Sequence, residues 1–476
     1  MDKQLRRFFL SLAPLLLCSV VATAAEGQAR RPNIVILLAD DLGWADVGYH
    51  GGKIDTPNID RLAREGVRLE NFHVCPLCSP TRAGLMTGRW PIRYGMGEAV
   101  ITPWRPYGLP VTEHTLADLA AAAGCERRGA FGKWHLGHYR KEFLPLSRGF
   151  THFYGHYNGA FDYFTHQREG ELDWHHNADT CRDEGYSTDL VGREAARFIA
   201  DSPAGRPLFA YVAFNAPHLP LQAKPEDIAK YNTRIDDEKQ RIYAAMVDSM
   251  DQAIGEILAA IEAKGIAENT VVLFFSDNGA VTRLGDNHPW RGGKGSVYEG
   301  GVRVPAVIRW PAGIRGRREV NAMMGYIDVY PTVKRILGTA GADPNPLDGR
   351  DMLDVIRGKA EPPRRDWFSY IAQGTPDRTA LCDGTWKLVV LGGSALDATP
   401  NGNDQPGDPG SQPSIELFRL DRDPGEKTDL AAEQPEVVAR LLNRLQEFRR
   451  LKIDGVPDFR EGRKGFVAPK DWKILE

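Results

Sequence analysis

Runs of consecutive apolar residues recur along the chain, and each run is followed directly by polar residues. The runs have the length of strands and cover residues 33–39, 208–214 and 270–275, with a shorter run around 129–131. Runs without polar alternation are typical of strands that are buried on both faces of a sheet. Between the runs, helical segments are predicted over residues 58–65, 116–123, 189–200 and 242–264. This alternation predicts an α/β fold with a central, mostly parallel sheet flanked by helices.

The polar residues that follow these runs are candidates for a common site. In such sheets ligands bind beyond the carboxyl ends of the strands, so we expect these side chains to converge. The acidic and amide members offer only oxygen ligands, which suit Ca²⁺ or Mg²⁺ better than zinc, although an aspartate pair also caps loops and helices. The full set is Asp40, Asp41, Lys133, His135, His218, Asp277 and Asn278.

A turn that leads into a helix is predicted over residues 74–89. Ser79 suits the N-cap position and Pro80 the first helical position. Cys78 would then lie at the positive end of the helix dipole, where thiols become more acidic. Arg82 follows one turn later on the same side, where it could contact an oxyanion. A lone cysteine is more often a buried apolar residue, so the neighbouring polar groups are what favour a site here.

Basic side chains complete the candidate site. Lys133 and His135 lie in a turn bracketed by glycines, and Lys294 lies in the glycine-rich loop 290–301, where the backbone can approach a ligand closely. A hard cation, an arginine and two lysines around a nucleophile form a site for a tetrahedral oxyanion, either sulfate or phosphate.

The C-terminal part of the chain has a different pattern. Prolines and charged residues at 361–365 break the chain, and short strands are predicted after them over residues 367–371, 379–382, 386–391 and 415–420. A loop over 392–414 and an amphipathic helix over 435–449 complete the pattern. We therefore expect a catalytic domain of residues 26–360 and a smaller α+β domain of residues 361–476 with an antiparallel sheet.

The N-terminus has the pattern of a secretory signal peptide. Lys3, Arg6 and Arg7 precede an apolar run over residues 8–22, and small residues for cleavage follow. We expect residues 1–25 to be removed and the mature protein to be exported, to a periplasm or beyond. No later apolar run is long enough to span a bilayer, so no membrane contact is expected after cleavage.

Net charge and cysteine content indicate which partners and which cysteine modifications to expect. The net charge of −3 over 476 residues argues against a nucleic-acid partner. An odd number of cysteines remains after the signal peptide, so at least one is unpaired or modified, and the pairing of the others stays open. These residues are Cys75, Cys78, Cys125, Cys181 and Cys382.

The sequence Cys78-Ser-Pro-Thr-Arg82, followed by Leu85-Met-Thr-Gly-Arg89, resembles the signature of the type I, formylglycine-dependent sulfatases. The match continues through residues 132–137, 277–279 and the Lys294 loop in the same order. The resemblance implies an alkaline-phosphatase-like fold and oxidation of Cys78 to formylglycine by a dedicated maturation enzyme, before export or folding. The hydrated aldehyde, a geminal diol, would attack the sulfur of a sulfate ester.

The same resemblance implies roles for the site residues. One Ca²⁺ would be held by Asp40, Asp41, Asp277, Asn278 and the modified Cys78. The catalytic residues would be Cys78, Arg82, Lys133, His135, His218 and Lys294. Within the family, residues 135–142, 220–226, 243–251 and 290–294 resemble the N-acetylgalactosamine-4-sulfatases (arylsulfatase B). The implied substrate is a sulfated sugar such as N-acetylgalactosamine 4-sulfate.

Two other functions compete with sulfate-ester hydrolysis. A phosphonate or phosphate monoester hydrolase would use the same fold, metal and modified cysteine. A sulfated-glycan binding protein would result if Cys78 stays a thiol. The aromatic and histidine residues between 149 and 176 either stack on sugar rings or pack their loop onto the domain, and the sequence does not separate these possibilities.

Overall fold

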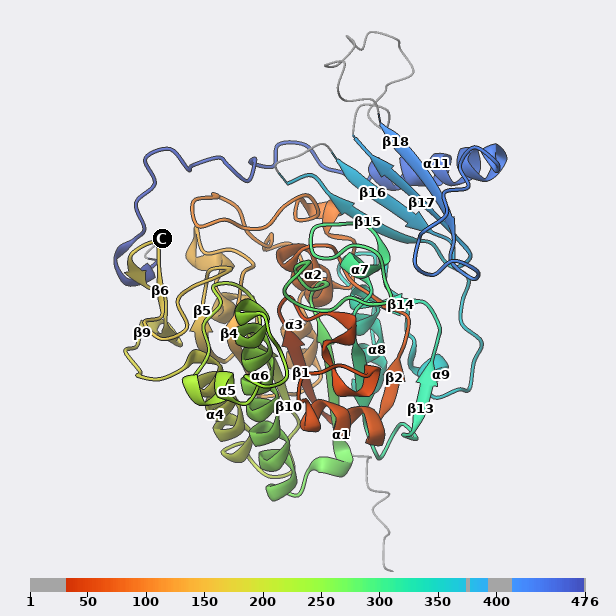
Figure 1. The fold of residues 1–476 in the computed structure, drawn as a ribbon. Coiled ribbons are helices and arrows are strands. Elements are labelled where there is room, and N and C mark those ends of the chain that lie inside the picture. Colours follow the sequence, from red (N-terminus) through yellow and green to blue (C-terminus); the bar gives the residue numbers. More distant parts are fainter. Residues whose placement is uncertain (1–30, 374–376, 393–412, 475–476) are drawn as a thin grey trace, which may run out of the picture. The chain divides into compact units, whose positions relative to one another are not determined.

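The central element of the computed structural model is a ten-stranded sheet (Figure 1). The structure describes residues 31–373, 377–392 and 413–474, so the expected signal peptide and most of the predicted 392–414 loop lie outside the described residues. In spatial order the strands are β13 (Arg318–Val320), β2 (Val67–Leu69), β12 (Ala306–Arg309), β11 (Thr270–Ser276), β1 (Asn33–Ala39), β10 (Leu208–Ala213), β4 (Arg127–Lys133), β5 (His152–His156), β8 (His175–His176) and β9 (Asp179–Thr180).

The middle of the sheet is parallel, as the apolar runs predict. The strands β11, β1, β10, β4 and β5 all run in the same direction, and Val35 of β1 pairs with Ala210 on one side and Val272 on the other. Within this sheet the antiparallel pairings lie outside the middle part, because β12 and β8 run in the opposite direction to their neighbours. The carboxyl ends of the central strands therefore meet at one edge of the sheet.

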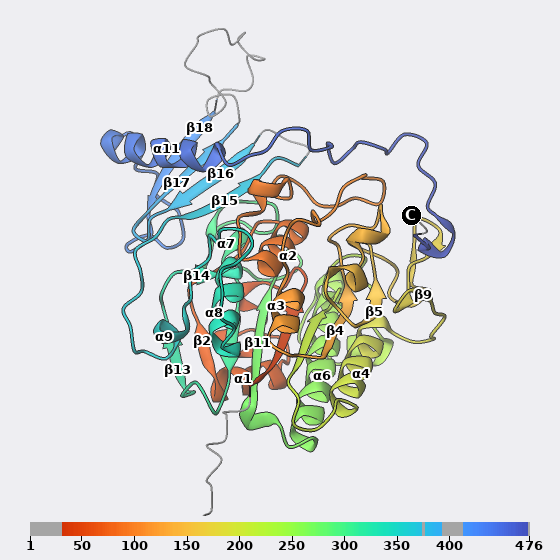
Figure 2. The same cartoon turned by 180° about the vertical axis from the view of Figure 1, so that it is seen from behind.

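Helices cover both faces of the sheet. Successive residues of a strand point to opposite sides, so a strand that is apolar throughout has an apolar surface to bury on each face. Ile34, Ile36 and Leu38 pack with α2 (Cys78–Thr87), α3 (Leu116–Ala122) and α8 (Val329–Leu337). Val35 and Leu37 pack on the other face with α1 (Pro57–Glu65), α4 (Ser187–Ala200) and α6 (Glu238–Ala263). Figures 1 and 2 show these two layers from opposite sides.

The remaining elements of the catalytic part are short. They are β3 (Phe72–His73), β6 (Gln167–Arg168), β7 (Glu171–Leu172), α5 (Pro225–Ala229), α7 (Glu299–Val302), β14 (Met324–Gly325) and α9 (Leu353–Ile356). The predicted helix over 242–264 begins earlier, at Glu238, because the Asp237 side chain caps it by accepting from the backbone N–H of Gln240 at 2.9 Å.

The C-terminal part contains the predicted antiparallel sheet. Its strands pair in chain order, and the helix α11 (Pro435–Arg449) has the predicted bounds. The rings of Phe368 and Phe448 stack with centroids 4.2 Å apart, and Trp90 packs edge-on against both. The strands are β15 (Trp367–Ile371), β16 (Arg378–Cys382), β17 (Trp386–Leu391) and β18 (Ser414–Arg419). A domain boundary at residues 360 and 361 stays a prediction.

No helix among the described residues has the length and apolar content that a membrane span requires.

Candidate active site

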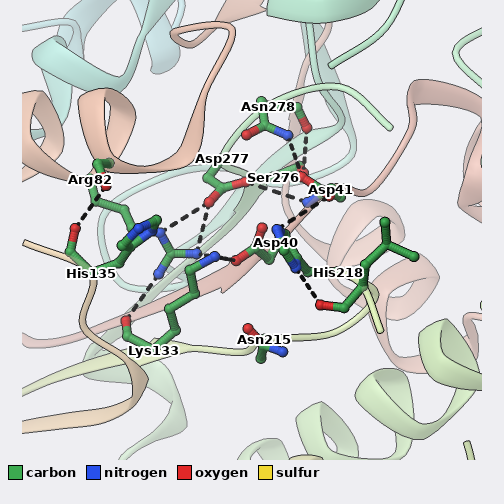
Figure 3. Close-up of polar contacts among 12 residues, drawn as sticks. Asp40, Asp41, Arg82, Lys133, His135, Asn215, His218, Ser276, Asp277 and Asn278 are labelled. Carbon is green, nitrogen blue, oxygen red and sulfur yellow. Dashed lines mark hydrogen bonds and ion pairs between the residues drawn. The ribbon is translucent and has the colours of Figure 1, made fainter. Parts of the chain in front are cut away.

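Six of the predicted site residues lie at the ends of four neighbouring strands. Asp40 and Asp41 follow β1, Asp277 and Asn278 follow β11, and Lys133 ends β4. His218 comes from the loop after β10, which lies between β1 and β4 in the sheet. Figure 3 shows their side chains converging at this edge, and all of them except His218 are almost fully buried.

Arg82 is the centre of an ion-pair network. Its Nε and one terminal nitrogen donate to Asp277 Oδ2 at 3.0 and 2.7 Å, and the same terminal nitrogen reaches Asp40 Oδ2 at 3.0 Å. The other terminal nitrogen donates to the backbone carbonyl of Lys133 at 3.0 Å, while the Lys133 ammonium contacts Asp40 Oδ2. Arg82 therefore orients two carboxylates of the site, and its contact with an oxyanion stays a prediction.

Several oxygens of this cluster are free to bind a cation. Asp40 Oδ1 and Asn278 Oδ1 are buried and, within the described part of the chain, accept no hydrogen bond. Buried oxygens without a partner are costly unless a ligand satisfies them. Asp41 lies beside them, and its backbone φ of 67° is a strained conformation for a non-glycine residue. An all-oxygen set with unsatisfied acceptors fits Ca²⁺ or Mg²⁺.

The charges of the cluster divide its carboxylates into two kinds. Burial alone would raise the pKa of Asp40, but Lys133, His218 and Arg82 outweigh it and hold this pKa well below its usual range. Burial and the neighbouring Asp40 raise the pKa of Asp277 instead. Asp277 is thus the carboxylate that accepts a proton more readily, which suits a group that takes part in proton transfer.

Cys78 begins helix α2 and is only 2% exposed. The helix starts two residues earlier than predicted, and the assignment of Ser79 as N-cap is wrong, since Leu77 occupies that position. Ser79 Oγ instead donates to the His135 carbonyl at 3.0 Å and accepts from the Ile101 N–H at 3.1 Å. The expected acidic thiol is also wrong, because burial raises the pKa of Cys78 although Lys133 and Lys294 oppose it.

His135 is held as a neutral base. Its Nε2 lies 2.9 Å from the Ile101 carbonyl, which can only accept, so Nε2 carries the proton and Nδ1 keeps a lone pair. This Nδ1 is buried and has no hydrogen-bond partner among the described residues. Burial, together with Lys133 and Arg82, holds the pKa of His135 well below its usual range. The backbone φ of 55° at this residue is a second strained position of the site.

His218 and Lys294 lie on the Asp41 side of the cluster. The Lys294 ammonium contacts Asp41 Oδ1 at 2.7 Å, and His218 Nε2 lies 3.9 Å from Asp41 Oδ2. His218 Nδ1 lies 2.6 Å from the Leu219 carbonyl, so Nδ1 carries the proton and Nε2 faces the cluster. Burial, with Lys294 and Lys133 nearby, lowers the pKa of His218 to about 4.

Three residues of the site were not singled out by sequence reasoning. Asn215, in the loop after β10, is buried with neither side-chain polar atom hydrogen-bonded within the described chain, and Figure 3 shows it near Lys133 and His218. Ser276 Oγ accepts from the Leu42 N–H at 3.0 Å. The Tyr243 hydroxyl donates to Asp46 Oδ2 at 2.6 Å and lies 2.9 Å from the Asp41 carbonyl. Asn215 and Ser276 stand at strand ends, which is the signal that could have identified them.

The aromatic segment of residues 149–176 packs onto the fold. Trp174 and His175 are buried, and Phe161 stacks on His156 with centroids 3.9 Å apart. Phe164 is the large apolar side chain of this segment that is exposed. Of the two possibilities left open by the sequence, packing accounts for most of these residues.

Comparison with known proteins agrees with this geometry. A sequence profile of the family described as Sulfatase matches residues 32–339. The chain is also 32% identical to arylsulfatase J of Mus musculus over 467 residues, which covers 90% of this chain and 78% of the relative. The chain belongs to the sulfatase family.

Other sulfatases match over nearly the whole chain. N-acetylgalactosamine-6-sulfatase of Mus musculus is 31% identical over 485 residues, covering 93% of this chain and 91% of the relative. The solved structure described as Ps i-CgsB is 30% identical, with a TM-score of 0.81, and the match covers 91% of this chain and 96% of that one. This sulfatase therefore has the expected alkaline-phosphatase-like fold and hydrolyses sulfuric esters.

Proposed function

We propose that this sulfatase removes sulfate from a sulfated saccharide, using formylglycine derived from Cys78 and one Ca²⁺. The observation that carries the proposal is the pair of unsatisfied buried oxygens, of Asp40 and Asn278, beside a helix that begins with Cys78. A saccharide is supported by the relatives, since one is named for N-acetylgalactosamine and a solved structure, 29% identical, was determined with a neocarrahexaose.

The metal would be held by Asp40, Asp41, Asp277, Asn278 and the modified Cys78. When bound, Ca²⁺ would balance the negative charge of the carboxylates and of the sulfate. Formylglycine would supply a hydrated aldehyde as the nucleophile, which a buried thiol of raised pKa cannot match.

The other side chains would position the sulfate and move protons. Lys133 pairs with Asp40 and Lys294 with Asp41, and both ammonium groups would hold sulfate oxygens. Lys294, an ammonium, would supply the proton of the leaving alcohol, and His218, which presents Nε2 toward the cluster, would grip the sulfate and share in this proton transfer once its Nε2 is protonated. His135, with the lone pair on Nδ1 free, would take the proton of the second hydroxyl of the diol, so that the aldehyde forms again and sulfate leaves.

The sugar is proposed to be N-acetylgalactosamine 4-sulfate or a related unit, following the likeness of residues 290–294 and 243–251 to the 4-sulfatases. We further propose export by the signal peptide of residues 1–25 and maturation by a formylglycine-generating enzyme. Residues 26–360 would carry the chemistry, and residues 361–476 would form one wall of the substrate cleft.

Two measurements on protein from a host with the maturation enzyme test this proposal. Mass spectrometry of the peptide that contains Cys78 should show the loss of mass that converts a thiol to an aldehyde. Sulfate release should be found with defined saccharides sulfated at the 4-position, in preference to the 6-position, and should be abolished in Cys78→Ala and by removal of calcium. A thiol in fully active protein would overturn the formylglycine mechanism.

Paired substrates separate the competing functions. An aryl sulfate should be cleaved faster than the matching aryl phosphate or phosphonate, and the reverse order would favour the phosphoester hydrolase. Binding of sulfated saccharides with no release of sulfate from matured protein would favour the glycan-binding function.

A further inference from the structure

A second group of metal-ligating side chains lies away from the catalytic cluster, where β5, β8 and α4 meet. His152 begins β5, His176 ends β8, and Glu194 lies in the middle of α4. Tyr154 of β5 pairs with His176, and His152 is two residues from Tyr154, so both histidines are on the same face of the sheet. That face is the one on which α4 packs.

The three side chains are close enough to bind one ion. One ligand atom from each lies within 4.8 Å of the ligand atoms of the other two. His152 Nε2 is 2.9 Å from Glu194 Oε1, and the two imidazole rings have centroids 5.2 Å apart. Glu194 is thus the ion-pair partner of His152 Nε2, and this buried nitrogen has no further hydrogen-bond partner among the described residues.

We propose that His152, His176 and Glu194 bind a divalent transition-metal ion, with Zn²⁺ as the preferred ion. Two imidazole nitrogens and one carboxylate oxygen are a common three-residue zinc set, and water would complete the tetrahedron. The nitrogen ligands favour zinc over Ca²⁺, which prefers oxygen. All three residues are only partly exposed, so one side of the group remains open to solvent for that water and for entry of the ion.

Arg197 positions the carboxylate of this group. Its Nε and one terminal nitrogen donate to the two oxygens of Glu194, each at 2.8 Å. An arginine in this place fixes the orientation of a ligating carboxylate in the way that outer partners of metal ligands do. Arg197 itself is 60% exposed and one turn away on α4, and Glu194 Oε1 accepts from it while also lying 2.9 Å from His152 Nε2.

The proposed zinc group is separate from the catalytic cluster. Lys133 pairs with His156 at the carboxyl end of β5, whereas His152 is at the amino end. Four residues of extended strand place these ends about 13 Å apart. The ion would therefore connect β5 and the short strand β8 to helix α4, so bound zinc raises the thermal midpoint and leaves sulfate-ester hydrolysis unchanged.

Titration of mature, calcium-saturated enzyme with ZnCl₂ tests the proposal, because excess calcium keeps zinc from the catalytic cluster. One equivalent of zinc should bind to the wild type, and His176→Gln and His152→Gln should each weaken binding at least tenfold. Matched controls are His114→Gln, an exposed histidine elsewhere, and Cys181→Ser, which removes a partly exposed thiol. Both controls should bind zinc as the wild type does.

Cobalt provides a second measurement. Co²⁺ in the same protein should give the visible bands of a tetrahedral site, present in Cys181→Ser and absent in His176→Gln. If His152→Gln fails to fold, as judged by circular dichroism, His176→Gln alone decides. The proposal is overturned if calcium-saturated wild type binds no zinc, or if His176→Gln binds zinc as tightly as the wild type.

Discussion

Replacing Lys387 by methionine should lower the free energy of unfolding by about 3–5 kcal/mol, the usual effect of removing one partner of a buried ion pair. The Lys387 ammonium, on β17, lies 2.8 Å from Glu299 Oε1 and 2.9 Å from Glu426 Oε1, and the three side chains are 2%, 1% and 0% exposed. Methionine fills a similar volume, so the main change is two carboxylates left without the ammonium.

The loss of unfolding free energy in Lys387→Met should depend on pH. Burial raises the pKa of Glu426 to about 6 although Lys387 opposes it, against 4.5 for an ordinary glutamate. Because the folded value is the higher one, ionised Glu426 destabilises the fold above pH 6, and this penalty fades as the pH falls toward 4.5. The deficit of Lys387→Met should therefore be smaller at pH 5 than at pH 8, and Glu426→Gln in the same chain should restore part of the stability.

Urea unfolding followed by tryptophan fluorescence measures these differences. Lys452→Met is the matched control, since Lys452 pairs with Glu98 at 2.6 Å but is 41% exposed, and its loss should stay below about 1 kcal/mol. Equal losses for the two variants at pH 8, or a deficit of Lys387→Met that grows toward pH 5, would refute the reasoning.

Three further predictions concern the active site. Asn278→Ala should weaken calcium binding at least tenfold in titration calorimetry, whereas Asn321→Ala, on the surface, should not. Because the pKa of His135 lies well below 6.5, kcat should fall with acid only below that pH, and a decline centred at or above 6.5 would contradict a neutral resting His135. Tyr243→Phe should lower the free energy of unfolding by about 1–3 kcal/mol, because the buried carboxylate of Asp46 loses a hydroxyl donor at 2.6 Å. Urea unfolding measures this loss. An unchanged midpoint would argue that Asp46 is protonated and hydrogen-bonded to another group.

The parts of the fold that the sequence predicted are those with strong local patterns. The strand over residues 33–39 is apolar from residue 34 onward because both of its faces are covered, and α11 has a clear apolar stripe. The strands that were not predicted, such as β8 with two residues and β2 with three, exist because neighbouring strands pair with them. So short a segment carries too little pattern of its own to be recognised.

The candidate site also has features that the sequence could predict and features that it could not. The sequence could predict that the side chains of Asp40, Asp277 and Lys133 lie close together, because parallel strands end at one edge of the sheet. The individual contacts between these side chains could not be predicted. Arg82, for example, pairs with Asp40, which is 42 positions away in the chain, and with Asp277, which is 195 positions away. The thiol of Cys78 shows the limit of a local argument, because burial by distant segments outweighs the helix dipole.

Because Cys78 is buried in the folded protein, the proposed modification of its side chain must take place before folding is complete. A maturation enzyme cannot reach a side chain that is 2% exposed, so conversion must compete kinetically with folding. The sheet above α2 closes only when β1 has paired with β10 and β11, whose residues are synthesised about as late as residues 208–276. Such distant pairings are slow to form, and they leave the chain around Cys78 accessible for longer than a fold built from local contacts would. Variants that speed closure of the central sheet should then lower the fraction of converted, active protein without changing the activity of each converted molecule.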